Sequence, residues 1–157
     1  MGIERVVSGG QTGVDRAALD VALARGLACG GWCPRGRRAE DGPIDRRYPL
    51  RETAGEDPAE RTRLNVRDSD GTLIIARGEP TGGTKLSGEM AAELGRPCLR
   101  IDPAATDRGA ACKRVRRWAA RESIGVLNVA GPRESEQPGI GAEAKVLLED
   151  VLPRGDA

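Results

Sequence analysis

The sequence contains no histidine and no phenylalanine, and its aromatic residues are one tyrosine and two tryptophans. Without phenylalanine, the core has to be built from aliphatic side chains and alanine. Without histidine, the chain lacks the side chain that most often serves as a general acid or base and a frequent zinc ligand. These absences weaken the case for a hydrolytic or zinc-dependent active site.

The cysteines do not form a recognisable metal-binding motif. Four cysteines are present, and Cys29 and Cys33 have the spacing C-x3-C, but no second close pair follows them. Structural zinc sites need such a second pair. We therefore expect no metal site, and we expect the cysteines to be reduced and to act as small buried apolar residues.

Long apolar runs and an excess of one charge are also missing. No stretch approaches the ~20 apolar residues of a membrane span, and a start with Glu4 and Arg5 does not have the form of a signal peptide. Lys and Arg number 25 against 24 Asp and Glu, a formal net charge of +1. This balance gives no indication of a nucleic-acid or membrane partner. We expect a cytoplasmic protein.

Apolar runs alternate with helix-like patterns along the chain. Strands are predicted at 3–7, 27–32, 72–76, 97–101 and 126–130. Helices are predicted near 14–25, 86–94, 111–119 and 140–151, and residues 57–60 have the form of a helix start. This alternation implies right-handed crossovers and a mainly parallel sheet. The expected fold is α/β: residues 1–157 as a single, doubly wound, Rossmann-like domain of about five strands.

Three glycine-rich segments, 8–13, 80–84 and 131–141, each follow a predicted strand and precede a predicted helix. Glycine lets the backbone approach a ligand, and the N–H groups at a helix start attract anions. Ligands of doubly wound sheets bind at the carboxyl ends of strands, so we expect these loops to meet and bind phosphate or another oxyanion. For any one loop, a tight turn without a ligand is the simpler interpretation. The residues expected to contribute are Gly9, Gly10, Gln11, Thr12, Gly13, Arg16, Gly82, Gly83, Thr84, Ser135 and Gly139.

The spacing of these glycines does not match two standard nucleotide-binding motifs. Gly9, Gly10 and Gly13 do not form G-x-G-x-x-G, and no Lys-Ser or Lys-Thr pair follows as in a P-loop. This argues against a hydride-transfer dehydrogenase or a classical ATPase. Thr12 and Asp15 have the spacing of a helix-capping pair, so we expect Asp15 to be a cap rather than a catalyst.

The connection after the second predicted strand is rich in arginine. Residues 33–51 hold six arginines against three acidic residues. Arginine suits bidentate binding of phosphate, and the face of Trp32 could stack on a flat ring, although a tryptophan in or beside the core is the simpler interpretation. The expected ligand-binding residues in this region are Trp32, Arg35, Gly36 and Arg37.

The chain resembles the molybdenum cofactor carrier family, small Rossmann-like relatives of the lysine-decarboxylase-like proteins. The matching segments follow one another through nearly the whole chain: 8–20, 31–37, 40–42, 48–50, 52–53, 61–62, 65–74, 82–84, 131–135 and 138–140. The resemblance implies a homo-oligomer that binds molybdenum cofactor (molybdopterin), molybdate or a related anion at its glycine-rich loops. It also implies that the ligand is protected, left unchanged and passed to recipient molybdoenzymes.

Two alternatives remain open. Related proteins that cleave nucleoside monophosphates carry a Gly-Gly-x-Gly-Thr-x-x-Glu loop, whereas here Thr84 follows Gly82 and Gly83 directly and the nearest glutamate, Glu89, is displaced. A nucleotide-binding sensor would use the same phosphate loops without turnover. Because no histidine and no serine or cysteine with a neighbouring base is evident, the sequence favours a binding protein over an enzyme.

Overall fold

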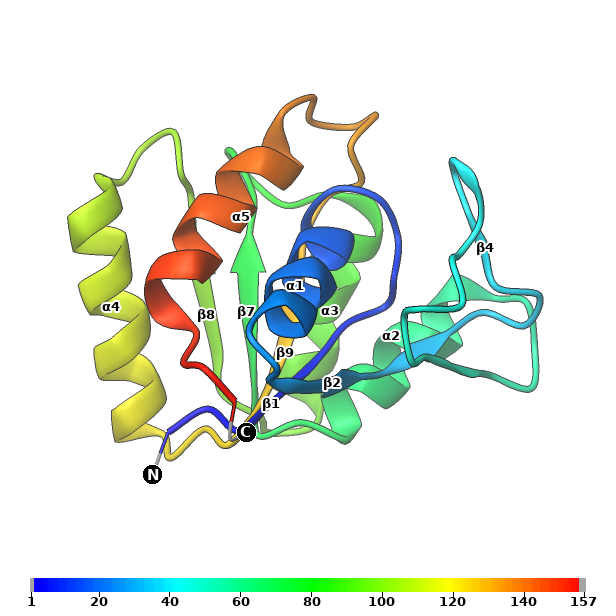
Figure 1. The fold of residues 1–157 in the computed structure, drawn as a ribbon, viewed down its shortest axis with the longest axis horizontal. Coiled ribbons are helices and arrows are strands. Elements are labelled where there is room, and N and C mark those ends of the chain that lie inside the picture. Colours follow the sequence, from blue (N-terminus) through cyan, green and yellow to red (C-terminus); the bar gives the residue numbers. More distant parts are fainter. Residues whose placement is uncertain (1, 156–157) are drawn as a thin grey trace.

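The central sheet has five strands in the order β2–β1–β9–β7–β8, and every neighbouring pair is parallel (Figure 1). The computed structural model describes residues 2–155. The strands are β1 (Arg5–Val7), β2 (Ala28–Gly30), β7 (Gly71–Ile75), β8 (Cys98–Ile101) and β9 (Val126–Ala130). The predicted doubly wound parallel sheet is confirmed, with each strand inside or within a residue of its predicted range.

Helices cover both faces of this sheet (Figure 1). They are α1 (Val14–Ala24), α2 (Pro58–Arg67), α3 (Gly82–Glu93), α4 (Arg108–Arg121) and α5 (Ile140–Val151). On one face α5 packs between α1 and α4, and on the other face α2 packs against α3. No helix among residues 2–155 is long and apolar enough to cross a membrane.

The core is aliphatic, as the lack of phenylalanine requires. All five residues of β7 are buried. The fully buried side chains of the core include Leu73 of β7, Leu127 of β9 and Leu148 of α5. Trp118 of α4 is the aromatic residue of the main core cluster. A strand that is buried on both faces reads as a continuous apolar run, which explains why β7 was evident in the sequence.

The structure confirms the predicted helix start at residues 57–60 but not the capping pair predicted for α1. Asp57 caps α2, with its carboxylate accepting from the N–H of Ala59 at 3.0 Å and Pro58 at the first helical position. The capping pair predicted for α1 is wrong: its N-cap is Gly13, and no side chain caps it. The hydroxyl of Thr12 instead contacts Glu40.

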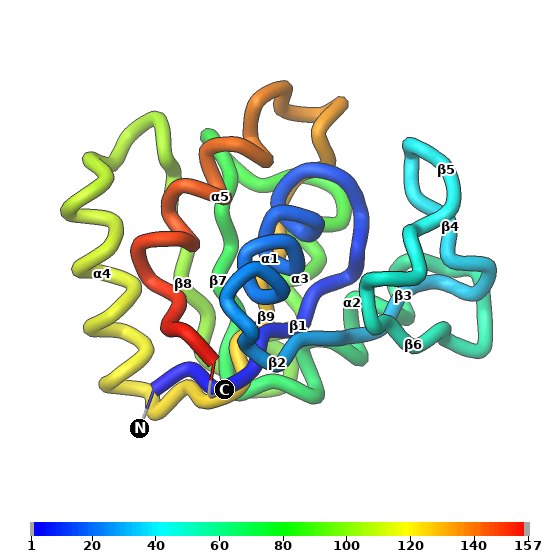
Figure 2. Tube along the Cα trace, viewed as in Figure 1, coloured from blue at the N-terminus to red at the C-terminus, as the bar shows by residue number. Residues whose placement is uncertain are grey.

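The long connection between β2 and α2 contains four short strands and extends to one side of the central sheet (Figure 2). The predicted strand 27–32 breaks at Gly31, where φ is 130° and a Cβ would overlap the backbone of Ser8. Beyond the break, β3 (Trp32–Cys33) pairs with β6 (Arg51–Glu52), and β4 (Arg38–Ala39) forms a hairpin with β5 (Gly42–Pro43). A second buried cluster of Leu19, Cys33, Ile44 and Tyr48 attaches this connection to α1.

Burial of the cysteines is uneven. Cys33 is buried as expected, but Cys98 is exposed and the other two are half-buried. The expectation of buried cysteines is therefore wrong for Cys98, which begins β8 at the edge of the sheet.

Candidate ligand-binding site

The strand order brings the three glycine-rich loops to one edge of the sheet. The chain leaves β1 toward β2 and leaves β7 toward β8, in opposite directions, and β9 lies between β1 and β7. All strands are parallel, so their carboxyl ends share one edge. Ligands of open α/β sheets bind at such a switch point.

A cavity of about 300 Å³ opens at this edge. It is lined by Gly9, Gln11 and Asp15 around the start of α1, by Pro58, Arg61, Thr62 and Asn65 of α2, by Gly83, Thr84 and Ser87 of α3, and by Asn128, Val129, Ala130, Gly131, Arg133 and Glu136 of β9 and the following loop. Elements far apart in sequence therefore share one cavity.

The start of α3 offers free hydrogen-bond donors to this cavity. Within residues 2–155, the N–H groups of Gly82, Gly83 and Thr84 have no protein acceptor. A Cβ on Gly83 would meet no atom within 4 Å, so the space beside it is open. Unpaired N–H groups at a helix start, together with the helix dipole, favour an anion.

The starts of α1 and α5 are largely satisfied within the protein. In α5, the carboxylate of Glu134 accepts from the N–H groups of Gly139 and Gly141 at 2.6 and 3.1 Å. In α1, the N–H of Val14 donates to the carbonyl of Pro132 at 3.3 Å. Of the three helix starts predicted to bind an anion, α3 is therefore the one in which the first three N–H groups all lack a protein acceptor within residues 2–155.

Two arginines line the cavity, together with the carboxylate of Glu136. The guanidinium of Arg61 donates to the carbonyl of Gly9 at 3.0 Å, and a Cβ on Gly9 would overlap its side chain. Arg133, on the loop after β9, pairs with Glu40 at 3.3 Å and with Glu136 at 3.7 Å. Gly9 thus keeps the room that Arg61 needs to reach the cavity.

Asp15 is the buried acid of the cavity, with 8% of its surface exposed. Desolvation by burial raises the pKa of Asp15 from 3.8 to about 6. The charge of Arg61 and hydrogen bonds from the backbone of Gln11 and Gly131 oppose this rise in pKa. The carboxyl therefore titrates near pH 6, inside a cavity that also holds two guanidinium groups.

The structure divides the residues predicted from the three loops. Gly9, Gln11, Gly83 and Thr84 line this cavity. Thr12, Gly13, Arg16 and Ser135 line a second cavity of about 720 Å³. Gly10, Gly82 and Gly139 line neither cavity.

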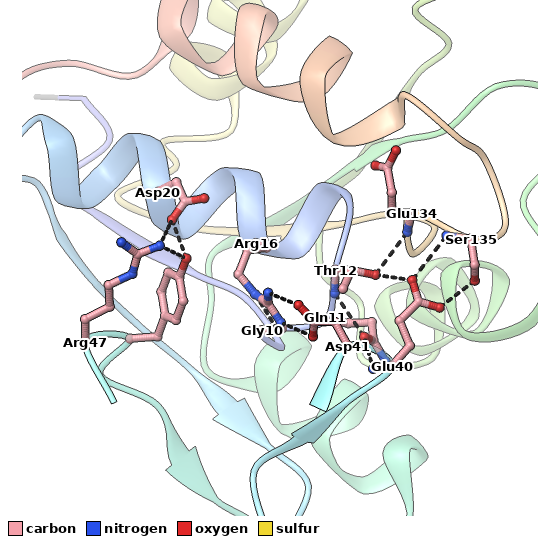
Figure 3. A network of polar contacts seen from close by, with 11 residues as sticks. Gly10, Gln11, Thr12, Arg16, Asp20, Glu40, Asp41, Arg47, Glu134 and Ser135 are labelled. Carbon is pink, nitrogen blue, oxygen red and sulfur yellow. Dashed lines mark hydrogen bonds and ion pairs between the residues drawn. The ribbon is translucent and has the colours of Figure 1, made fainter. Parts of the chain in front are cut away.

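Gly10 faces away from both cavities. A Cβ there would overlap the side chain of Leu50 and approach that of Ile44, so the residue packs against an apolar pair. Its carbonyl accepts from the guanidinium of Arg16 at 3.1 Å, and Arg16 also pairs with Asp41 at 2.9 Å (Figure 3). Arg16 therefore holds the loop and the hairpin together.

The four residues predicted from the arginine-rich connection line neither cavity. The guanidinium of Arg51 lies 4.6 Å from the ring centroid of Trp32, whose indole N–H donates to Asp68 at 2.9 Å. Arg37 donates to four backbone carbonyls between residues 44 and 50. These side chains are engaged in holding the connection.

The backbone N–H of Gly36 donates to Glu52 at 2.8 Å. Arg35 lies 3.9 Å from Glu56 on an exposed surface. Arg35 and Gly36 therefore belong to the same connection and stand apart from the cavity.

Sequence reasoning did not single out Arg61, Asn65, Ser87 and Arg133. On α2, Pro58, Arg61, Thr62 and Asn65 recur at helical spacing, which is a signal for one polar face. That signal points to a site only once α2 is known to lie beside the start of α3. Ser87 stands three residues after Thr84, where the nucleotide-cleaving loop has its glutamate, and Glu89 is exposed outside the cavity.

Comparison with known proteins identifies one solved structure and one family model that match nearly the whole chain. A search of curated proteins finds no match. A protein named "Putative molybdenum carrier protein" from Syntrophus aciditrophicus SB, of known crystal structure, has 43% sequence identity to this chain, and the two structures superpose with a TM-score of 0.95. The match covers 97% of this chain and 96% of that chain, so the resemblance to molybdenum carrier proteins is confirmed. The model of the family described as "Circularly permutated YpsA SLOG family" matches residues 6–152, and the chain belongs to this family.

Proposed function

We propose that this protein binds and carries molybdenum cofactor or a related phosphate-bearing ligand or oxyanion, with the anionic group at the start of α3. The observation that carries the proposal is the set of free N–H groups at Gly82, Gly83 and Thr84 beside the cavity that holds Arg61 and Arg133. Charge-assisted hydrogen bonds to an anion are about twice as strong as neutral ones. The name of the relative from Syntrophus aciditrophicus supports a molybdenum-related ligand.

The size of the cavity suits a small ligand. Its volume of about 300 Å³ is at the lower end of the range for ligand pockets, roughly 300 to 1,000 Å³. The guanidinium of Arg51 lies over one face of the Trp32 ring, and Trp32 lines neither cavity, so the proposal rests on the anionic end of the ligand rather than on a flat ring.

The lining of the cavity supports binding without turnover. Ser87 stands where a nucleotide-cleaving relative has a glutamate, and a hydroxyl that donates to the carbonyl of Gly83 at 3.1 Å is a poor general acid or base. Of the two carboxyl groups that line the cavity, Asp15 and Glu136, Asp15 is the one to test for turnover, because its pKa of about 6 allows proton transfer near neutral pH.

Isothermal titration calorimetry with molybdate, phosphate, nucleoside monophosphates and isolated molybdopterin tests the proposal. Arg61→Gln should weaken binding of the preferred ligand by about tenfold or more, since it removes one charge-assisted contact. The matched control is Arg117→Gln, which makes the same change on an exposed position of α4. Equal affinities of wild type and Arg61→Gln, or no binding of any ligand, would refute the proposal.

Turnover is measured on the same preparation. Wild type and Asp15→Asn are incubated with nucleoside monophosphates, and free base is quantified by chromatography. Release of base by wild type that is lost in Asp15→Asn would establish the enzyme alternative. Tight nucleotide binding without release, and no affinity for molybdate or pterin, would establish the sensor.

A further inference from the structure

The carboxylate of Glu40, at the tip of the β4–β5 hairpin, sits in a cradle of donors from two other loops (Figure 3). One oxygen accepts from the hydroxyl of Thr12 and from the N–H of Ser135, the latter at 3.1 Å. The other oxygen accepts from the hydroxyl of Ser135 at 2.5 Å and lies 3.3 Å from Nε of Arg133. Each carboxylate oxygen therefore has two partners.

The donors are oriented toward an anion at this position. The N–H of Glu134 donates to the hydroxyl oxygen of Thr12 at 3.1 Å, so the hydroxyl hydrogen of Thr12 is left to point at Glu40. Hydrogen bonds from Ser135 and Thr12 lower the pKa of Glu40, which keeps the group charged at neutral pH. Two hydroxyls, one N–H and one guanidinium make a set of the kind that binds phosphate.

The cradle adjoins the proposed ligand cavity. Arg133 lines that cavity and pairs with Glu40, while Thr12 and Ser135 line the second cavity. Gln11, which also lines the first cavity, accepts the N–H of Glu40 at 2.9 Å. Glu40 is therefore in contact with residues of both cavities.

We propose that Thr12, Ser135 and Arg133 form an oxyanion subsite, and that the carboxylate of Glu40 is its displaceable internal occupant. A tetrahedral oxyanion such as molybdate or phosphate presents two oxygens along one edge, as a carboxylate does, and can take the same four contacts. This subsite extends the proposed function and rests on it for the identity of the complete ligand. On displacement, Asp41 and the N–H of Glu40 remain to hold the hairpin.

The test measures affinity for molybdate and, separately, for inorganic phosphate by calorimetry. Glu40→Gln removes the competing charge, so it should bind the preferred anion about tenfold or more tightly than wild type. Asp45→Asn is the matched control, because it removes one negative charge from an exposed position of the same connection that lines neither cavity. Thr12→Val in the Glu40→Gln background should cancel most of the gain.

A gain in Glu40→Gln that Thr12→Val cancels supports the subsite. Unchanged or weaker binding in Glu40→Gln, or an equal gain in Asp45→Asn, overturns it. A dependence of wild-type binding on Arg61 with no effect of Glu40→Gln would overturn the subsite alone, and binding that appears only in Glu40→Gln would support the subsite and refute the site at α3.

Hydrogen–deuterium exchange of the wild-type protein provides a measurement that needs no variant. Addition of molybdate or phosphate at saturating concentration should speed exchange of the backbone N–H groups of residues 38–42, because the hairpin loses the contacts of its Glu40 side chain. Unchanged or slower exchange in these residues while the anion is bound would overturn the displacement.

Discussion

Burial of Asp15 makes the stability of this protein depend on pH in a defined direction. The pKa of this carboxyl is about 6 in the folded protein against 3.8 for an unburied aspartate, and its side chain is almost inaccessible. The folded state therefore binds the proton more tightly than the unfolded state does. The stabilisation of the folded state by the protonated Asp15 carboxyl is complete below pH 3.8 and is lost as the pH rises through 6.

The magnitude follows from the two pKa values. One pKa unit corresponds to about 1.4 kcal/mol, so the rise from 3.8 to about 6 makes the ionised carboxylate cost about 3 kcal/mol above pH 7. Asp15→Asn has no group to ionise at this position. Between pH 4 and pH 8, the unfolding free energy of wild type should fall by about 2 to 3 kcal/mol relative to that of Asp15→Asn.

Urea unfolding of both proteins at several pH values between 4 and 8 measures this difference. Other titrating groups are common to the two proteins and cancel in the comparison at each pH. A difference that stays constant across this range, or that changes in the opposite direction, would refute the assignment of a buried, desolvated carboxyl at Asp15.

Three further predictions concern two glycines and the assembly. Gly83→Val places a side chain in the open space at the start of α3. It should weaken anion binding about tenfold or more, while lowering the unfolding free energy by less than about 1 kcal/mol. Calorimetry measures the first effect and urea unfolding the second, and retained affinity would contradict the prediction. Gly10→Leu should instead destabilise the fold by at least about 2 kcal/mol, because φ is 80° there and the side chain meets Leu50; unchanged urea unfolding would count against this packing. We also expect a homo-oligomer, as the resemblance implies, and exposed Leu23 and Val146 on the neighbouring helices α1 and α5 offer apolar surface for it; light scattering that gives 16.6 kDa at micromolar concentration would show a monomer.

The sequence predicted the fold well because the signals for it are local. The apolar run at β7, the helical spacing in α5 and the Asp57-Pro58 helix start each depend on neighbours within a few residues. The alternation of such elements then restricts the topology to a parallel sheet, and glycine-rich loops after three of its strands point to its carboxyl edge.

Only the tertiary structure decided which of these loops can receive a ligand. Glu134 accepts from two N–H groups at the start of α5 and Pro132 from one at the start of α1, whereas the first three N–H groups of α3 have no acceptor within residues 2–155. Likewise Arg51 lies over one face of Trp32, and Glu40 meets Ser135 from a distance of 95 residues along the chain. The physical reason is that folding brings acceptor groups from remote parts of the chain to some N–H donors and not to others. The local spacing of residues does not predict which donors receive an acceptor.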